Sequence, residues 1–137
     1  MPDAAFPIER LKTRSEFLAC AKAPACAKGS LVVQARPRDD GQALVRIGFT
    51  ATKRIGGAVQ RNRAKRRMRE AARRIVAEAG LAGTDYVFIA RGGLITRPWA
   101  RLLDDMKSAL LRLAADRPAP HMPVDLPLPA GNPRPRS

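Results

Sequence analysis

The segment from residue 58 to residue 79 constrains the fold more than any other part of the chain, because it contains neither proline nor glycine. Alanine, arginine, lysine, glutamate and methionine dominate it, and all of these are good helix formers. At about 100° per residue, one set of apolar side chains gathers into a single stripe. The stripe consists of Ala64, Met68, Ala71, Ala72, Ile75 and Ala79. The segment therefore predicts a long amphipathic helix with one side in a core.

The same helix is strongly basic. Residues 53–74 contain ten lysine and arginine residues and one acid, Glu70, which gives this stretch a net charge of +9. The cations cover both flanks of the apolar stripe. One flank carries Lys65, Arg66, Arg69 and Arg73 together with Asn62, and the other carries Arg63, Arg67 and Arg74. Such a helix can pack its apolar side on a sheet while it presents its cations to a polyanion.

The charge of the whole chain points the same way. Its 137 residues include 26 Lys+Arg and 12 Asp+Glu, so the formal net charge is +14 and the isoelectric point is about 11.4. A compact domain with this charge repels itself unless a partner neutralises it. Nucleic acid is the commonest partner of this kind, and an anionic membrane surface is the next.

Nothing in the sequence predicts secretion or a membrane span. The chain has no run of about 18 apolar residues, the length that a membrane helix needs. Its N-terminus lacks the basic and apolar regions of a signal peptide. Cys20 and Cys26 have no nearby histidine and are expected to be free thiols. We therefore expect a cytoplasmic protein.

The N-terminal part predicts an arm followed by a short helix. Residues 1–12 contain two prolines and no periodicity, and we interpret them as an arm. Thr13 and Glu16 have the spacing of a capping box, in which each side chain binds the backbone N–H of the other residue. A helix over about residues 14–23 should follow, since Pro24 cannot continue it.

Two strands are predicted next, over residues 31–36 and 45–52. The second alternates between apolar and small or polar side chains, as a half-buried strand does. Asp39, Asp40 and Gly41 favour a turn between the two. We therefore expect the two strands to pair as an antiparallel hairpin.

A third strand and a last helix follow the basic helix. Gly80 is a suitable residue to follow the helix end. Residues 85–91 predict a strongly apolar strand, parallel to one of the earlier two because a helix connects them. Pro98 suits the first turn of the last helix, whose apolar residues repeat at helical spacing. These residues are Trp99, Leu102, Leu103, Met106, Leu110 and Leu113.

The predicted fold class is α+β, a two-layer α-β sandwich with its elements in the order α-β-β-α-β-α. We assign residues 1–12 to the N-terminal arm and residues 13–116 to a single domain. Residues 117–137 are rich in proline and lack an apolar pattern, so we interpret them as a flexible tail.

The residue types favour a protein that binds a polyanion over an enzyme that cleaves it. The only histidine, His121, lies in the tail, so nucleophilic catalysis has no credible base. Asp39–Asp40 is more simply a turn and Asp104–Asp105 a solvated helix face, so neither pair predicts a metal centre. Gly56–Gly57, before the basic helix, could cradle a phosphate through backbone N–H groups or form a plain turn.

Phe17 is the aromatic residue best placed to stack on a nucleic-acid base. It lies on the short helix, beside a sheet face that is small and polar through Thr50 and Thr52. A cleft there could hold a few nucleotides, with Phe17 and Gln34 against the bases. Ordinary packing of the helix on the sheet is an equal alternative.

Residues 46–70 carry a longer pattern. They read R-I-G-F-T-A-T-K-R-I-G-G-A-V-Q-R-N-R-A-K-R-R-M-R-E, which closely resembles the signature of the protein subunit of bacterial ribonuclease P. In that family a strand of the type R-V-G-x-x-V-S-K-K leads through I-G-x-A-V into R-N-R-x-K-R-x-x-R. Arg10-Leu11-Lys12, Phe17 and residues 85–91 also fall where the family has matching elements. The resemblance covers about residues 8–115.

The resemblance implies the family's fold, with a mixed sheet and the basic helix as a left-handed crossover, similar to the second domain of a small-subunit ribosomal protein. It implies an RNA-binding domain whose partner is the catalytic RNA of ribonuclease P and whose substrate is precursor tRNA. The enzyme removes the 5′ leader of that precursor. The RNA and its bound Mg²⁺ would carry the chemistry, so no catalytic or metal-binding residue is expected in the protein. One protein monomer would join one RNA.

The resemblance also implies two sets of site residues. Those expected to bind the RNA subunit are Arg61, Asn62, Arg63, Lys65, Arg66 and Arg69. Those expected to line a cleft for the leader are Phe17, Gln34, Thr50, Thr52, Lys53 and Arg54. The chain departs from the family pattern at Ala21 and Gln34, where many members carry aromatic residues, and at Gly57, where many carry asparagine. Stacking on the leader should therefore be weaker here.

Two other functions remain open from the residues alone. A structural RNA-binding protein of the ribosomal kind would have the same composition. A DNA-binding module could place the basic helix in a major groove, although cations on both flanks exceed what such a helix needs.

Overall fold

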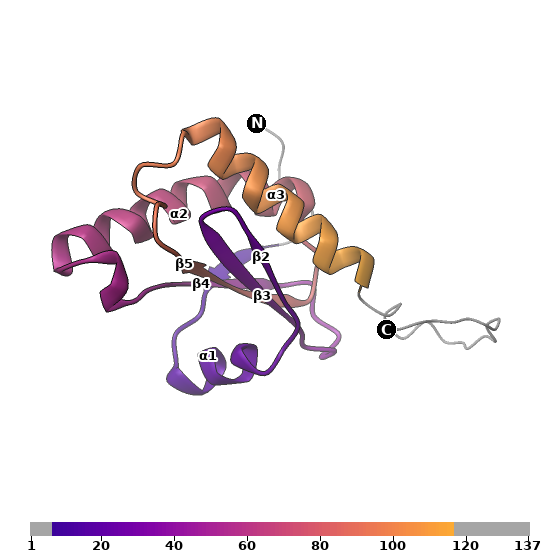
Figure 1. The fold of residues 1–137 in the computed structure, drawn as a ribbon. Helices are drawn as coiled ribbons and strands as arrows, with labels where there is room; N and C mark the ends of the chain where they lie inside the picture. The colour runs from indigo at the N-terminus through magenta and orange to yellow at the C-terminus, as the bar shows by residue number, and fades with distance from the viewer. Residues whose placement is uncertain (1–6, 117–137) are drawn as a thin grey trace.

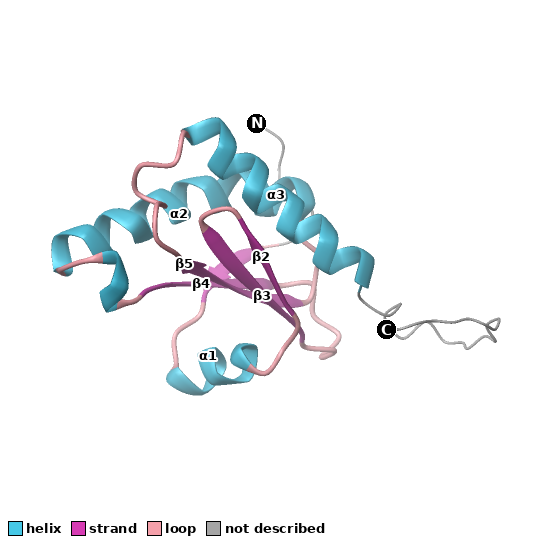
Figure 2. Ribbon diagram, in the orientation of Figure 1, coloured by secondary structure: helices cyan, strands magenta, loops and turns pink. Residues whose placement is uncertain are grey.

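The structure, a computed structural model, describes residues 7–116 and has five strands and three α-helices within them (Figure 1; Figure 2). The strands are β1 (Ile8–Arg10), β2 (Ala25–Lys28), β3 (Leu31–Pro37), β4 (Val45–Ala51) and β5 (Thr84–Ala90). The helices are α1 (Arg14–Ala21), α2 (Ala58–Ala79) and α3 (Trp99–Asp116), with a short 3-10 turn, η1 (Lys53–Ile55), ahead of α2. The expected tail at 117–137, with His121, lies outside the described residues.

Helices α2 and α3 lie together on one face of the sheet, and α1 covers part of the other face (Figure 1). The main core lies between the sheet and the α2–α3 layer, where Tyr86 and Phe88 of β5 are its largest fully buried side chains. A smaller apolar cluster of Leu11, Cys20 and Val87 lies beneath α1. The α+β sandwich that the sequence predicts is confirmed.

Strand β5 lies at the centre of the sheet, whose order is β1-β4-β5-β3-β2. It pairs parallel to β4 and antiparallel to β3. The parallel pairing of residues 85–91 with an earlier strand is therefore confirmed. The hairpin expected between residues 31–36 and 45–52 is wrong, because β5 separates those strands. Six of the seven residues of β5 are buried, as expected for a central strand whose two faces are both covered by other elements.

Two short edge strands, β1 and β2, were not predicted from the sequence. β1 pairs parallel to β4, so residues 8–10 are a strand rather than part of an arm without secondary structure. β2 pairs antiparallel to β3 and makes the real hairpin, turning at Gly29, whose φ of +53° favours glycine. Strands of three and four residues are too short to show a clear alternating pattern.

Helix α2 buries the stripe that its sequence predicts. All six stripe residues are at most 9% exposed, and Val76 is buried beside them. Helix α3 buries four of its six expected core residues, which are Leu102, Met106, Leu110 and Leu113. Trp99 is 37% exposed, because it begins the helix and turns toward Arg67, whose guanidinium carbon lies 5.7 Å from the ring centroid.

The helix ends agree with their local sequence in part. The capping box of Thr13 and Glu16 is present at α1. Gly80 follows α2 as expected, but its φ of −73° is not left-handed. Glycine is favoured there by close approach instead, since a Cβ would lie 2.7 Å from the carbonyl oxygen of Val76. Pro98 directly precedes α3 rather than lying inside its first turn.

Candidate nucleic-acid interface

Most of the cations expected to contact RNA lie on the flank of α2 that faces β4. Arg61, Lys65 and Arg69 follow one another at intervals of four residues, so they line one side of the helix, and all three are half-buried. The guanidinium carbon of Arg69 lies 5.8 Å from the ring centroid of Phe49 on β4, which places this flank beside the sheet. The exposed members of the same flank are Asn62 and Arg66.

Arg63 lies on the opposite flank, one turn before Arg67. Nη1 of Arg67 donates to the carbonyl oxygens of Leu94 and Ile95, and its guanidinium lies over Trp99. Arg67 therefore ties α2 to the segment that leads into α3, whereas Arg63 is exposed. Arg63 thus lies apart from the other five residues that the family resemblance groups with it, as the helical periodicity of the sequence predicts.

The sheet face that α1 covers brings together Phe17, Gln34 and Thr50. Val87 of β5 pairs with Gln34 on one side and Gly48 on the other, and Thr50, two residues along, points the same way. Phe17 lies over Gly48, where an added Cβ would come 2.5 Å from its Cε1 atom. The ring of Phe17 therefore packs on the sheet and is half-buried, and its contact with a base stays a prediction.

The other three residues expected in the cleft lie at the end of β4 and in η1. They are Thr52, Lys53 and Arg54, and all are exposed. Arg54 and Ile55 line a cavity of about 210 Å³ whose remaining wall is residues 92–96. The structure thus spreads the six expected cleft residues over the α1 face and the adjoining end of the sheet.

Gly56 and Gly57 separate η1 from α2. Gly56 has a φ of +138°, a conformation that favours glycine. Gly57 is the N-cap of α2, and no side chain caps this end of the helix. The first N–H groups of α2 are therefore left to solvent or to an anion, and both alternatives for the glycine pair remain compatible with the structure.

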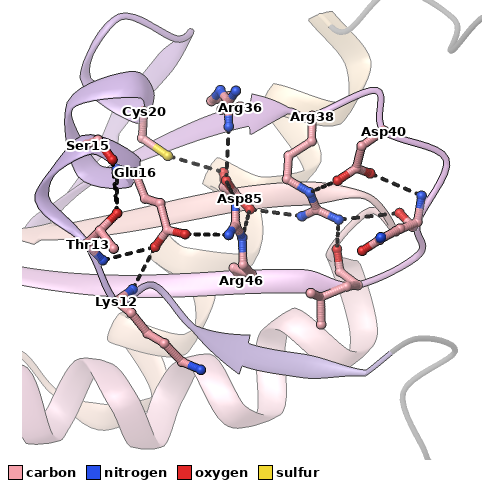
Figure 3. A network of polar contacts seen from close by, with 12 residues as sticks. Lys12, Thr13, Ser15, Glu16, Cys20, Arg36, Arg38, Asp40, Arg46 and Asp85 are labelled. Carbon is pink, nitrogen blue, oxygen red and sulfur yellow. Dashed lines mark hydrogen bonds and ion pairs between the residues drawn. The ribbon is translucent and has the colours of Figure 1, made fainter.

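Sequence reasoning missed an ion-pair network centred on Asp85, whose side chain is fully buried (Figure 3). Arg46 donates from Nε to Oδ1 at 2.9 Å and from Nη2 to Oδ2 at 2.8 Å. Arg38 donates to Oδ1 at 2.9 Å and Arg36 to Oδ2 at 3.2 Å. Burial alone would raise the pKa of Asp85, but the hydrogen bonds and charges of Arg46 and Arg38 hold it below its usual range. The match of these residues across the sheet is visible only once the strand order is known.

Glu16 extends this network to α1 (Figure 3). Its Oε1 accepts from the backbone N–H of Lys12 at 2.7 Å and of Thr13 at 3.1 Å, and its Oε2 accepts from Nη1 of Arg46. These backbone hydrogen bonds, with a smaller effect of the Arg46 charge, hold the pKa of Glu16 below its ordinary value. The first turn of α1 is thereby attached to β4.

Both cysteines are free, as expected. The Cys20 thiol donates to the carbonyl oxygen of Asp85 at 3.9 Å. Burial raises the pKa of Cys20 to about 11. Because the thiolate is the reactive form, we assign Cys20 a role in packing.

Among residues 7–116, no group of three or more His, Cys, Asp or Glu side chains could hold a metal ion. No helix in this range is long and apolar enough to cross a bilayer.

Comparison with known proteins decides the family. The family model described as Ribonuclease P matches residues 7–114. This chain belongs to the ribonuclease P protein family. It is 61% identical over 108 residues to the ribonuclease P protein component of Caulobacter vibrioides, covering 79% of this chain and 72% of that protein. It is 50% identical over 113 residues to the ribonuclease P protein component of Ruegeria pomeroyi, covering 81% of this chain and 90% of that protein.

Solved ribonuclease P proteins share the fold. The protein from Thermotoga maritima matches with a TM-score of 0.61 and 26% identity, over 75% of this chain and 96% of that one. The protein from Staphylococcus aureus matches in fold with a TM-score of 0.62 and 24% identity, over 77% and 94% of the two chains. The family resemblance drawn from residues 46–70 is confirmed. The chain is a protein component of the ribonuclease P ribonucleoprotein, an endoribonuclease of tRNA 5′ processing, and has an RNA partner.

Proposed function

We propose that this chain binds the ribonuclease P RNA through α2 and the 5′ leader of precursor tRNA through the α1 face of the sheet. The observation that carries this proposal is the position of β4 between the two sets of site residues. Phe49 lies under Arg69 of α2, whereas Gly48, on the other face of the strand, lies under Phe17 of α1. Neighbouring residues of one strand therefore support two RNA interfaces on opposite faces.

The interface with the RNA subunit consists, in this proposal, of Arg61, Asn62, Arg63, Lys65, Arg66 and Arg69. The cations neutralise phosphates, so the affinity falls steeply as salt is added. Asn62 is neutral, and its amide offers a hydrogen bond to an RNA group. Because Arg63 lies on the other flank, an RNA that contacts all six residues must wrap around the N-terminal turns of α2.

The leader interface consists, in this proposal, of Phe17, Gln34, Thr50, Thr52, Lys53 and Arg54. Single strands bind where cations follow the backbone and a π-face is open to the bases. The half-buried ring of Phe17 offers such a face, and the exposed side chains of Lys53 and Arg54 offer cations at the end of the sheet. Ala21 is exposed beside this face and adds no ring, so stacking on the leader should be weak.

We assign the cleavage of precursor tRNA to the RNA partner and to the Mg²⁺ that this RNA binds. The chain contributes by binding and orienting the two RNAs. One protein monomer joins one RNA, and the complex acts in the cytoplasm.

Reconstitution tests this function. Cleavage of precursor tRNA is measured at low Mg²⁺ with ribonuclease P RNA alone and with the protein added. We expect the protein to increase the rate, and the increase to shrink when the leader is shortened to one nucleotide. Protein that cleaves precursor tRNA without the RNA, or that leaves the rate unchanged, would contradict the proposal.

A further inference from the structure

Helix α1 needs an anchor outside its own length. It has eight residues, and an isolated helix this short is unstable in water. The apolar cluster beneath it contains three buried residues, with Phe17 and Ile89 partly buried against them. Polar contacts with the sheet therefore add to the attachment of α1.

The carboxylate of Glu16 provides this anchor with both of its oxygens (Figure 3). Oε1 accepts from the backbone N–H groups of Lys12 and Thr13, which begin the helix, while Oε2 accepts from Arg46 of β4. One side chain thus starts α1 and joins it to the strand that also lies under α2.

Arg46 is itself held in place. It binds both carboxylate oxygens of the fully buried Asp85, and the two partners lie next to each other across β4 and β5. Two parallel hydrogen bonds of this kind fix the plane of a guanidinium group as well as its position. The docking point that Arg46 offers to Glu16 is therefore fixed by the sheet.

Phe17 follows Glu16 directly and lies over Gly48, two residues along the strand from Arg46. Adjacent residues of α1 therefore dock on alternate residues of β4. We propose that Glu16 and Arg46 are positioning residues for leader binding. Asp85 fixes Arg46, Arg46 binds Glu16, and Glu16 thereby sets the place of the neighbouring Phe17 ring on the sheet. This inference rests on the proposed function, in which Phe17 contacts the leader.

The test compares Glu16→Gln with Glu78→Gln in protein reconstituted with ribonuclease P RNA. An amide at position 16 can still accept the capping N–H bonds but presents donors to Arg46. Glu78→Gln makes the same change in net charge at an exposed residue that pairs with Lys107. We expect Glu16→Gln to raise the Kd for precursor tRNA with a leader of several nucleotides about fivefold. The Kd for a one-nucleotide leader should not change, and Glu78→Gln should alter neither value.

Two outcomes would overturn the positioning role. One is an unchanged Kd for the long leader, and the other is an equal rise for both leaders, which would indicate a role in folding alone. Phe17→Ala separates this inference from the proposed function. If Phe17→Ala weakens long-leader binding and Glu16→Gln does not, only the positioning role fails. If neither variant affects leader binding, the leader site at Phe17 fails as well.

Discussion

The ring of Phe17 occupies the space that a side chain at Gly48 would need. A Cβ at Gly48 would lie 2.5 Å from Cε1 and 2.6 Å from Cζ of the ring. Gly48→Ala should therefore displace α1 or β4 and lower the free energy of unfolding by about 1–3 kcal/mol. It should also weaken the binding of long-leader precursor tRNA. Urea unfolding and leader-length binding assays measure the two effects.

Gly92→Ala is the matched control for Gly48→Ala, because a Cβ at Gly92 would meet nothing within 4 Å. It should leave the free energy of unfolding nearly unchanged. The double variant Gly48→Ala with Phe17→Ala should lose less stability than the sum of the two single losses, since the overlap with the ring is then removed. If Gly48→Ala is as stable as Gly92→Ala, the packing of Phe17 on β4 is not as described.

Gly29 and Gly41 separate the cost of crowding from the cost of backbone conformation. Both have left-handed φ values, +53° and +76°, so alanine at either costs about 1 kcal/mol. A Cβ at Gly29 would also overlap the carboxylate of Asp105, which Arg97 holds with two hydrogen bonds, whereas Gly41 has open space. We expect Gly29→Ala to cost about 1–2 kcal/mol more than Gly41→Ala in urea unfolding. Equal costs would contradict the packing of Asp105 on the β2–β3 turn.

Asp85→Asn should remove a contribution to stability that depends on pH. The pKa of Asp85 is lowered in the fold, so its ionised form stabilises the protein above the unfolded-state pKa of about 3.9. That stabilisation is lost as the pH falls through the lower folded-state pKa. At neutral pH we expect a loss of about 3 kcal/mol, because Arg46 and Arg38 are left without their buried partner.

Measuring the unfolding of Asp85→Asn as a function of pH tests whether ionisation of Asp85 is the cause. The difference in unfolding free energy between the variant and the unmodified protein should narrow below about pH 4. Asp40→Asn, at an exposed acid that also pairs with Arg38, should show only a small difference throughout. A constant difference for Asp85→Asn from neutral to acid pH would mean that ionisation of Asp85 does not stabilise the fold.

Arg66 and Arg67 are adjacent cations with different expected roles. Arg66 is exposed, so Arg66→Ala should leave unfolding unchanged and reduce the slope of log K against log salt for RNA binding by about one. Arg67→Ala should instead lower the free energy of unfolding by about 1–2 kcal/mol, because the carbonyl oxygens of Leu94 and Ile95 lose their donor. An unchanged salt slope for Arg66→Ala would remove Arg66 from the interface.

Features with a strong local cause were predictable from the sequence. The stripe of α2 follows from the 3.6-residue period, and the capping box of α1 from the spacing of Thr13 and Glu16. The parallel pairing of β5 follows from the helix that connects it to β4. Helical periodicity alone also places Arg63 away from Lys65 and Arg69.

Features that depend on competition between distant segments were not predictable. Residues 39–41 favour a turn, and Asp39 does adopt a φ of 61°, but local turn chemistry could not show that β5 enters between β3 and β4. The ion pairs of Asp85 likewise depend on the strand order, which places Arg36 and Arg46 beside it. The structural role of Arg67, which contacts Trp99, could not be predicted either, because it depends on where α3 begins relative to α2.

Because side chains alternate along β4, a change in the length of the strand alters both of its faces at once. Insertion of a single residue before Gly48 would reverse the direction of every later side chain in the strand. Gly48 would then point toward α2 and Phe49 toward α1, so the supports of both helices would be lost in one step. Changes in chain length should therefore be tolerated better at the exposed turn of residues 39–41, which lies outside the strands, than within β4.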